Sequence, residues 1–298
     1  MPTSPRLIRR RIRSVTNTRK ITKAMELVAA AKMRKAVANV LASRPYADAA
    51  WHAVGELAKV TDATHHPLLE ERHGAGRTLV VLFSSDRGLC GGFTNQLMRR
   101  ALRFIVERQG SVDVAVSGKK GADALRRASV PVIAALTGLA DDPSFSATRP
   151  FADIAMGDFI SGTYDEVHIA YVDYRSALVQ TPIIKRILPI AGRPEELGAT
   201  DAAPVVKVRP DATEYLFEPS PRAVLDAMLP RLIEAQIYQA LLESAASEHA
   251  ARMMAMKSAT DSADDIVDGL TLAYNQARQA GITREIAEIS SGKAALER

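Results

Sequence analysis

The C-terminal third of the chain has the pattern of one very long helix, and this pattern constrains the fold more than any other feature. Ser220 is a helix-capping residue type and Pro221 suits the first helical position, so we expect the helix to begin there. Beyond Pro230, which is expected to bend the first turns, helical periodicity continues to about Glu288. About seventy residues at ~1.5 Å each span on the order of 100 Å. Such a length favours a coiled coil over an ordinary globular helix.

A heptad pattern within this segment supports the coiled coil. Small and apolar residues recur there at alternating spacings of three and four, which is typical of the seam of a left-handed coiled coil. The predicted seam consists of Met256, Ala259, Ala263, Ile266, Leu270, Ala273, Ala277 and Ala280. Because most of these residues are small, two helices can approach closely and form a thin rod. An ordinary helix packed on a globular core is the alternative, since the heptad is regular over only part of the segment.

The N-terminus supplies the expected partner helix, from residue 5 to about residue 57. Its apolar positions are Ile8, Ile12, Val15, Ile21, Met25 and Val28. Pro45 is expected to kink or break this helix, because proline removes a backbone donor. Residues 6 to 35 carry many arginines and lysines but one acid, Glu26, whereas the C-terminal third is acidic on balance. An antiparallel pair would place the basic helix beside the acidic one.

The middle of the chain alternates between strand-like and helix-like segments. The expected strands are 78–85, 112–118, 130–136 and 165–175, with 177–190 as a hairpin partner, and the expected helices are 94–108, 119–128 and 147–161. This alternation predicts a mostly parallel sheet flanked by helices. The fold class is therefore α/β: an antiparallel coiled coil with an inserted Rossmann-like domain. The expected segments are 1–60 and 212–298 for the two coiled-coil helices and 75–205 for the α/β domain. Residues 64–76 are expected to be a linker and 193–204 a loop.

No cluster of residues predicts a catalytic centre, a metal site or a cofactor. The glycine-rich segment SSDRGLCGG at 84–92 could bind phosphate, but it has neither the Walker lysine nor the G-x-G-x-x-G spacing, so a tight turn is the better interpretation. Cys90, the single cysteine, excludes an intrachain disulfide and is interpreted as a buried residue. His65, His66 and His73 crowd the linker and are interpreted as solvated side chains.

The basic N-terminus leaves a second function open. Clustered arginines and lysines can bind nucleic acid by neutralising phosphates, although no aromatic residues interleave with them for base stacking. A basic helix could also lie on a membrane surface. No segment approaches the ~20 consecutive apolar residues that a membrane-spanning helix requires. A third hypothesis, a nucleotide-binding enzyme built on the α/β domain, lacks the fingerprint of such enzymes.

Three segments together resemble a known family. The segments IRSVTNTRKITKAMELVAAAKMRKA, SSDRGLCGGFTNQL and ASEHAARMMAMKSATDSADDIVDGLTLAYNQARQAGITREIAEISSGKAAL are similar to the gamma subunit of F-type ATP synthases, and the similarity extends over essentially the whole chain. The resemblance implies a non-catalytic central-stalk rotor. Its terminal helices would turn inside a ring of alpha and beta subunits, and its α/β domain would lie against the epsilon subunit and the c-ring. It would couple transmembrane proton flow to ATP synthesis at the beta subunits.

The resemblance also implies roles for individual residues. Met25 matches a position facing the acidic lever loop of the beta subunit, and Arg19, Lys20 and Lys23 would be electrostatic partners of that loop. Arg278 and Gln279 match residues that bind the catch loop of beta, and Thr283 and Glu285 match nearby positions linked to coupling. Glu297 and Arg298 depart mildly from the small or apolar tails of the family. The redox switch of chloroplast relatives needs a cysteine pair, which this chain lacks.

Partners and location follow from the same resemblance. The expected partners are the alpha, beta and epsilon subunits and the c-ring, with no nucleic acid and no bound cofactor. Membrane association is expected only through the complex. The start at Met1 without a presequence favours a bacterial protein, peripheral to the inner membrane on its cytoplasmic side.

Overall fold

A computed structural model describes residues 5–60, 66–71, 76–108, 110–190 and 218–296. The chain forms two compact units, residues 1–28 with 253–298 and residues 29–252. The boundary between them crosses both long helices, so each unit contains a stretch of the N-terminal helix and a stretch of the C-terminal helix. The larger unit also contains the sheet.

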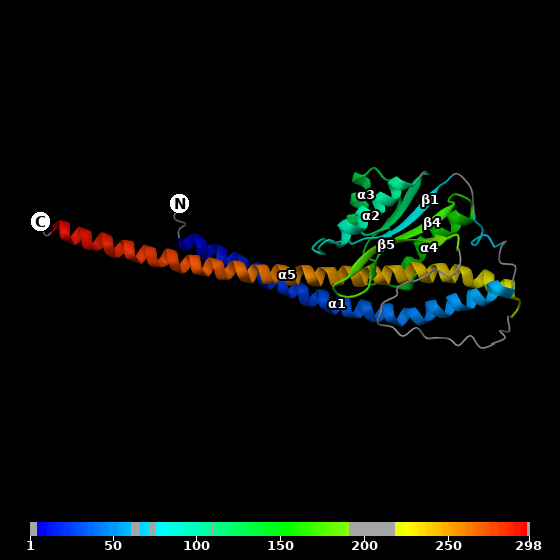
Figure 1. The fold of residues 1–298 in the computed structure, drawn as a ribbon, viewed down its shortest axis with the longest axis horizontal. Coiled ribbons are helices and arrows are strands. Elements are labelled where there is room, and N and C mark those ends of the chain that lie inside the picture. Colours follow the sequence, from blue (N-terminus) through cyan, green and yellow to red (C-terminus); the bar gives the residue numbers. More distant parts are fainter. Residues whose placement is uncertain (1–4, 61–65, 72–75, 109, 191–217, 297–298) are drawn as a thin grey trace. The chain divides into compact units, whose positions relative to one another are not determined.

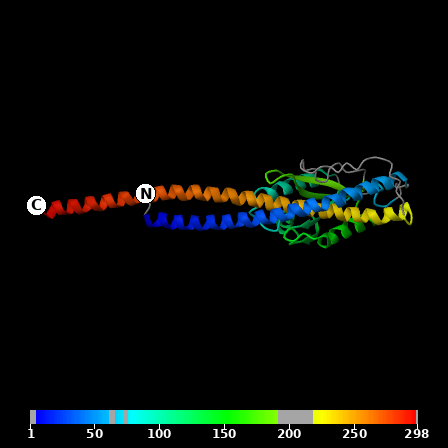
Figure 2. The ribbon, with the colours of Figure 1, turned by 90° about the horizontal axis from the view of Figure 1, so that it is seen from below.

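The two terminal helices form as expected. Helix α1 spans Pro5–Val60 and helix α5 spans Pro221–Leu296, and the two run antiparallel to each other (Figures 1 and 2). Ser220 caps α5, because its Oγ accepts a hydrogen bond from the backbone N–H of Ala223 at 3.2 Å. Pro45 lies inside α1 and does not end it, contrary to the break that was one of the expected outcomes. Pro45 is exposed, so its ring does not disturb packing between helices.

The α/β domain contains a five-stranded sheet in the order β3-β2-β1-β4-β5. Its elements are β1 Thr78–Phe83, α2 Phe93–Glu107, β2 Val112–Ser117, α3 Lys119–Arg127, β3 Val132–Leu136, α4 Phe145–Ile160, β4 Glu166–Tyr174 and β5 Gln180–Leu188. Strands β1 to β4 are parallel, and β5 pairs antiparallel with β4 as the expected hairpin partner. The Rossmann-like α/β prediction is confirmed.

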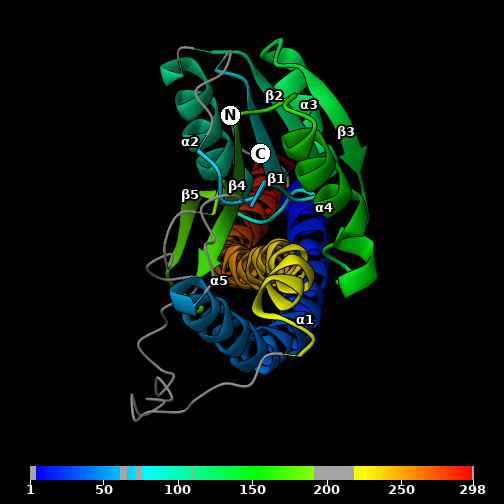
Figure 3. The same cartoon turned by 90° about the vertical axis from the view of Figure 1, so that its right-hand side faces the viewer.

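Helices cover both faces of this sheet (Figure 3). One core contains Leu82 of β1 and Leu97 of α2 together with Leu125 of α3. The other core lies on the opposite face, where α4 and the stretch of α5 from Leu225 to Leu241 pack against β1 and β4. Every residue of β1 is buried, which explains its continuous apolar sequence, since helices leave neither face of the strand in water.

Part of the expected linker is packed in the core. Leu68 is 1% exposed, and its carbonyl accepts a hydrogen bond from the backbone N–H of Ile190 at 2.9 Å. His66 is mostly buried rather than solvated, and its Nδ1 accepts a hydrogen bond from the N–H of Leu68 at 3.1 Å. Burial lowers the pKa of His66. The other two linker histidines and the expected loop 193–204 lie outside the described residues.

Candidate contact sites on the helical pair and the sheet edge

The smaller unit is a pair of helix segments with a regular seam. On α5, buried and half-buried positions recur at spacings of three and four: Met256, Thr260, Ala263, Val267, Leu270, Tyr274 and Ala277. On α1 the corresponding positions are Ile8, Ile12, Val15, Arg19, Thr22 and Glu26. Both runs have the 3-4 alternation of an antiparallel coiled coil.

The observed seam shares alternate positions with the seam expected from the sequence. Met256, Ala263, Leu270 and Ala277 belong to both. Between them, Thr260, Val267 and Tyr274 take positions next to those expected. Ile266 is 51% exposed and Ala280 is exposed, whereas Ala259 and Ala273 are half-buried. The expected and observed seams differ because α5 is rich in alanine. Neighbouring small residues make two heptad phases possible, and a pattern based on apolar residues omits the polar Thr260 and Tyr274.

Polar contacts fix the register of the two helices. Thr260 Oγ1 lies 2.9 Å from Thr22 Oγ1 and 2.9 Å from the carbonyl oxygen of Met256. The Arg19 guanidinium contacts the Asp264 carboxylate at 2.6 Å. Both side chains of this ion pair are more than 40% exposed, so the pair stabilises the unit little and mainly selects the alignment. It also confirms that the basic helix lies beside the acidic one.

The residues that the resemblance assigns to beta-subunit contacts lie mostly on the surface. Lys20, Lys23, Arg278, Gln279, Thr283 and Glu285 are exposed, and Met25 is half-buried. Lys23 contacts Glu26 of its own helix at 3.0 Å. The exposed side chains are accessible to a partner, which a contact role requires.

These residues form two separate zones rather than one site. Because Arg19 faces Asp264 and Thr22 contacts Thr260, Met25 lies opposite a position near 257 of α5. Arg278 lies about twenty residues further along α5, or roughly 30 Å at ~1.5 Å per residue. The structure therefore does not bring the α1 zone and the α5 zone together.

The α1 zone also contains exposed apolar residues, of which the sequence pattern places Ile21 and Val28 on the apolar face of the helix. Ile21 is 61% exposed, Leu27 60% and Val28 57%. They lie beside the basic residues and form an apolar surface that water covers in the isolated chain. The spacing could have revealed this, because a 3-4 alternation continued from Val15 reaches Arg19 and Thr22 rather than Ile21.

The glycine-rich segment 84–92 forms a structural turn. The Asp86 carboxylate accepts backbone N–H bonds from Lys119 at 3.0 Å and from Gly138 at 2.7 Å, and so joins the loops after β1, β2 and β3. Cys90 is 4% exposed and lies 3.8 Å from the Ser85 and Thr94 hydroxyls. None of these neighbours is a base that could activate a thiol, so the segment has the contacts of a scaffold.

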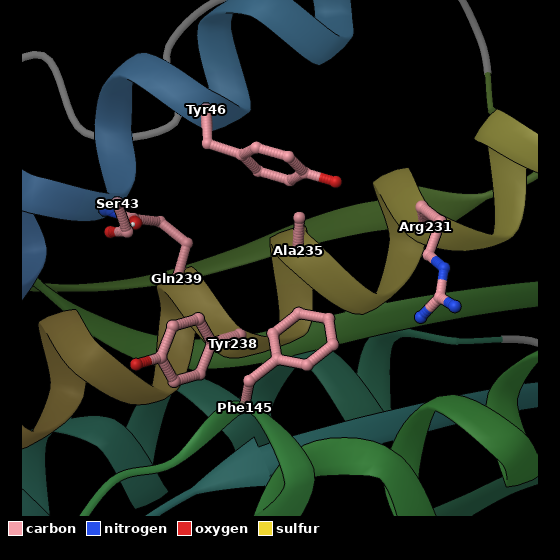
Figure 4. Close-up of a pocket in the computed structure, with 7 residues that line it drawn as sticks. All are labelled: Ser43, Tyr46, Phe145, Arg231, Ala235, Tyr238 and Gln239. Atoms are coloured by element: carbon pink, nitrogen blue, oxygen red, sulfur yellow. Dashed lines mark hydrogen bonds between the residues drawn. The ribbon is translucent and has the colours of Figure 1, made fainter.

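The larger unit contains a pocket of about 380 Å³ between α1, α5 and the start of α4. Tyr46 lies on one side, and Tyr238 and Phe145 lie on the other with their ring centroids 5.5 Å apart (Figure 4). Ser43 donates its hydroxyl proton to the Gln239 amide oxygen, which cannot act as a base. The pocket therefore lacks a nucleophile–base pair.

Two kinds of feature are absent from the described residues. No group of histidine, cysteine, aspartate or glutamate side chains is arranged to hold a metal ion among them. Within the same part of the chain, none of the helices combines the length and apolarity needed to cross a bilayer.

His249 of α5 predicts a pH dependence of stability. The side chain is 4% exposed, and burial, helped by Arg252 and Lys32, lowers its pKa to about 4. This histidine takes up a proton near pH 6.5 in the unfolded chain but only near pH 4 in the folded one. Its effect therefore leaves the free energy of unfolding at its full value above pH 6.5. As the pH falls from 6.5 towards 4, the free energy of unfolding decreases by about 1.4 kcal/mol per pH unit. We expect His249→Gln to flatten this slope in urea denaturation between pH 7 and pH 5, and an unchanged slope would contradict the assignment.

Known proteins are similar to this chain along nearly its whole length. A family model described as ATP synthase matches residues 4–296. The ATP synthase gamma chain of Herpetosiphon aurantiacus is 46% identical over 98% of this chain and 99% of its own length. That of Chloroflexus aurantiacus is 45% identical over 99% of each chain.

Solved structures share the fold at lower identity. A chain of the Euglena gracilis mitochondrial ATP synthase superposes with a TM-score of 0.65 at 18% identity, covering 98% of this chain and 94% of its own. One from the Tetrahymena thermophila central stalk and c-ring gives a TM-score of 0.59 over 80% and 99%. The curated relatives match this chain along essentially its full length at well above 30% identity. The chain therefore belongs to the ATP synthase gamma chain family.

Proposed function

We propose that the chain is the central-stalk rotor subunit of a bacterial F-type ATP synthase and has no catalytic activity of its own. Its α/β domain would be turned by a c-ring and contacted by an epsilon subunit. Its paired helices would turn inside a head of alpha and beta subunits. The complex would lie on the cytoplasmic side of the inner membrane, to which this chain is joined only through its partners. Nothing in the comparisons supports a nucleic-acid-binding protein.

The observation that carries the proposal is the helical pair of the smaller unit, with contact residues exposed in two zones. A rotor acts on catalytic sites by making different contacts with each of their conformations, since a partner with equal affinity for all states shifts none of them. Both zones contain cations, around Lys20 and Lys23 and at Arg278. Cations displayed at fixed heights on a helical pair can meet acidic loops of one beta subunit at a time.

Assembly with the head tests the proposal directly. The purified chain is mixed with alpha and beta subunits from the same source, and the stoichiometry of the product is measured by native mass spectrometry. The proposal requires one copy of the chain for every three alpha–beta pairs, together with ATP hydrolysis. Failure to assemble under conditions in which each subunit is folded would overturn it.

Charge reversal at Arg278 is expected to reduce ATP hydrolysis by the assembled head several-fold without unfolding the chain. The side chain is exposed, so Arg278→Glu removes a cation available to a partner and costs little stability. Arg149→Glu is the matched control, because Arg149 is an exposed arginine of α4. Equal rates of ATP hydrolysis by the two variants would show that Arg278 does not contact the head. The rotor function would then rest on the measured stoichiometry alone.

A further inference from the structure

The carboxyl edge of the sheet is the place where α/β domains of this topology bind ligands. In the order β3-β2-β1-β4-β5, the chain adds β2 and β3 on one side of β1 and then returns to add β4 on the other side. The topological switch point therefore lies between β1 and β4. The helix after β1 covers one face of the sheet, and α4, which leads into β4, covers the other. Such a switch point leaves a crevice beyond the strand ends, and nucleotide-binding folds use it.

Helix α5 lies against the ends of both strands that flank this switch point. The Ser244 hydroxyl donates to the carbonyl of Phe83 in the last residue of β1, at 3.0 Å. The Ser247 hydroxyl donates to the carbonyl of Val172 near the end of β4, also at 3.0 Å. Both serines are buried. The backbone groups that would face a ligand in an enzyme are therefore bonded to a helix of the same chain.

The next turn of α5 holds the glycine-rich loop. The Arg252 guanidinium lies 3.4 Å from the carbonyl oxygen of Arg87 and 3.5 Å from that of Gly88. It is held by the Glu248 carboxylate at 2.6 Å, and the two side chains are only 13% and 7% exposed. Burial raises the pKa of Glu248, which the nearby Arg252 opposes. The buried Glu248 thus holds the Arg252 side chain in an orientation in which its guanidinium faces the loop.

A third set of contacts reaches the loop after β3. The Lys32 ammonium contacts the Asp141 carboxylate at 2.6 Å. Lys32 comes from α1, so this helix also contacts the loops at the sheet edge. Because Asp86 joins the loops after β1, β2 and β3, these contacts form one continuous network.

We propose that this sheet edge is a grip, which holds α5 and carries torque between the helical shaft and the α/β domain. The proposal rests on the rotor function proposed above. Arg252 is its central positioning residue. An apolar contact of the same area would hold α5 against the sheet but would resist sliding and twisting weakly. Hydrogen bonds are directional, so side chains bonded to carbonyls near two strand ends and in the loop after β1 fix the rotation and the height of α5.

Hydrogen exchange on the isolated full-length chain tests the grip without any partner. Arg252→Ala should speed the exchange of backbone amides in residues 86–92 by on the order of tenfold. In the unmodified chain, local opening of this loop must break its contacts to Arg252, and the variant removes that free-energy cost. Exchange in the buried strands β1 and β2 should not change. Arg252→Lys keeps the charge beside Glu248, but its ammonium ends one bond short of the guanidinium nitrogen that contacts both carbonyls, so it should show the same local effect with less loss of stability. Arg149→Ala is the control and should change neither region.

The assembled, membrane-reconstituted complex then tests whether the grip carries torque. Arg252→Lys should lower the protons pumped per ATP hydrolysed, whereas hydrolysis itself and the amount assembled stay at the level of Arg149→Ala. Loop exchange unchanged in both Arg252 variants would overturn the grip. Faster loop exchange with unchanged pumping would overturn its role in torque. Failure of the unmodified chain to assemble would instead count against the rotor function, and the exchange result on the isolated chain would stand.

Discussion

Ala263→Trp should disrupt the helical pair of the smaller unit. Ala263 is 5% exposed in the seam, in the same turn as Asp264, which pairs with Arg19 of the facing helix. An indole at this position must push the helices apart, and overpacking of this kind costs about 1–3 kcal/mol or more. Within the smaller unit, the contacts between its two helix segments hold it together. We expect the amides of residues 5–28 to lose most of their protection from hydrogen exchange, and the melting of helical circular dichroism to begin at a lower temperature.

Ile266→Trp is the matched control and also tests the phase of the seam. The heptad expected from the sequence places Ile266 in the interface, whereas its side chain is 51% exposed in the structure. Tryptophan at an exposed helical position should leave protection of residues 5–28 close to that of the unmodified chain. Equal damage from the two substitutions would show that the expected phase is correct. Loss of protection from Ile266→Trp alone would contradict the observed seam outright.

Local signals were sufficient to predict the elements of this fold. The Ser220–Pro221 cap places the start of α5 correctly, and the continuous apolar run beginning at Thr78 places β1. Both are properties of a few neighbouring residues. Pro45 was harder to judge, because the cost of a proline in a helix depends on what surrounds it. There the ring is exposed and the helix continues.

Phase and long-range contacts could not be predicted in the same way. Alanine-rich segments of α5 allow more than one seam, and the choice depends on Thr260 finding Thr22 of the other helix. The contact of Ser244 with β1 joins residues 161 positions apart, and nothing in either local sequence indicates the other. The resemblance gave the two contact zones as positions along helices. Their separation became visible only once the register of α1 and α5 was known.

Gly118→Ala is expected to destabilise the α/β domain by on the order of 3 kcal/mol or more. Gly118 has φ +99°, which side-chain-bearing residues rarely adopt, and it follows β2 directly. A Cβ there would lie 2.3 Å from the carbonyl oxygen of Ser84, which belongs to the backbone and cannot move away independently. The backbone N–H of Ser84 donates a hydrogen bond to the Ser117 carbonyl at 2.8 Å. A movement of Ser84 that relieved the clash would therefore break the pairing between the ends of β1 and β2.

Gly157→Ala is the opposite case and serves as the control. Gly157 lies inside α4 and is exposed, and beyond the backbone of its own helix no atom lies within 4 Å of the added methyl group. Alanine is the better helix former, so this change should stabilise the domain by about 0.5–1 kcal/mol. Urea denaturation followed by hydrogen exchange of the β1 and β2 amides separates the α/β domain from the helical pair. A Gly118→Ala midpoint equal to that of the unmodified chain would mean that the β2–α3 turn can adopt a different backbone conformation without loss, and that Ser84 does not confine it.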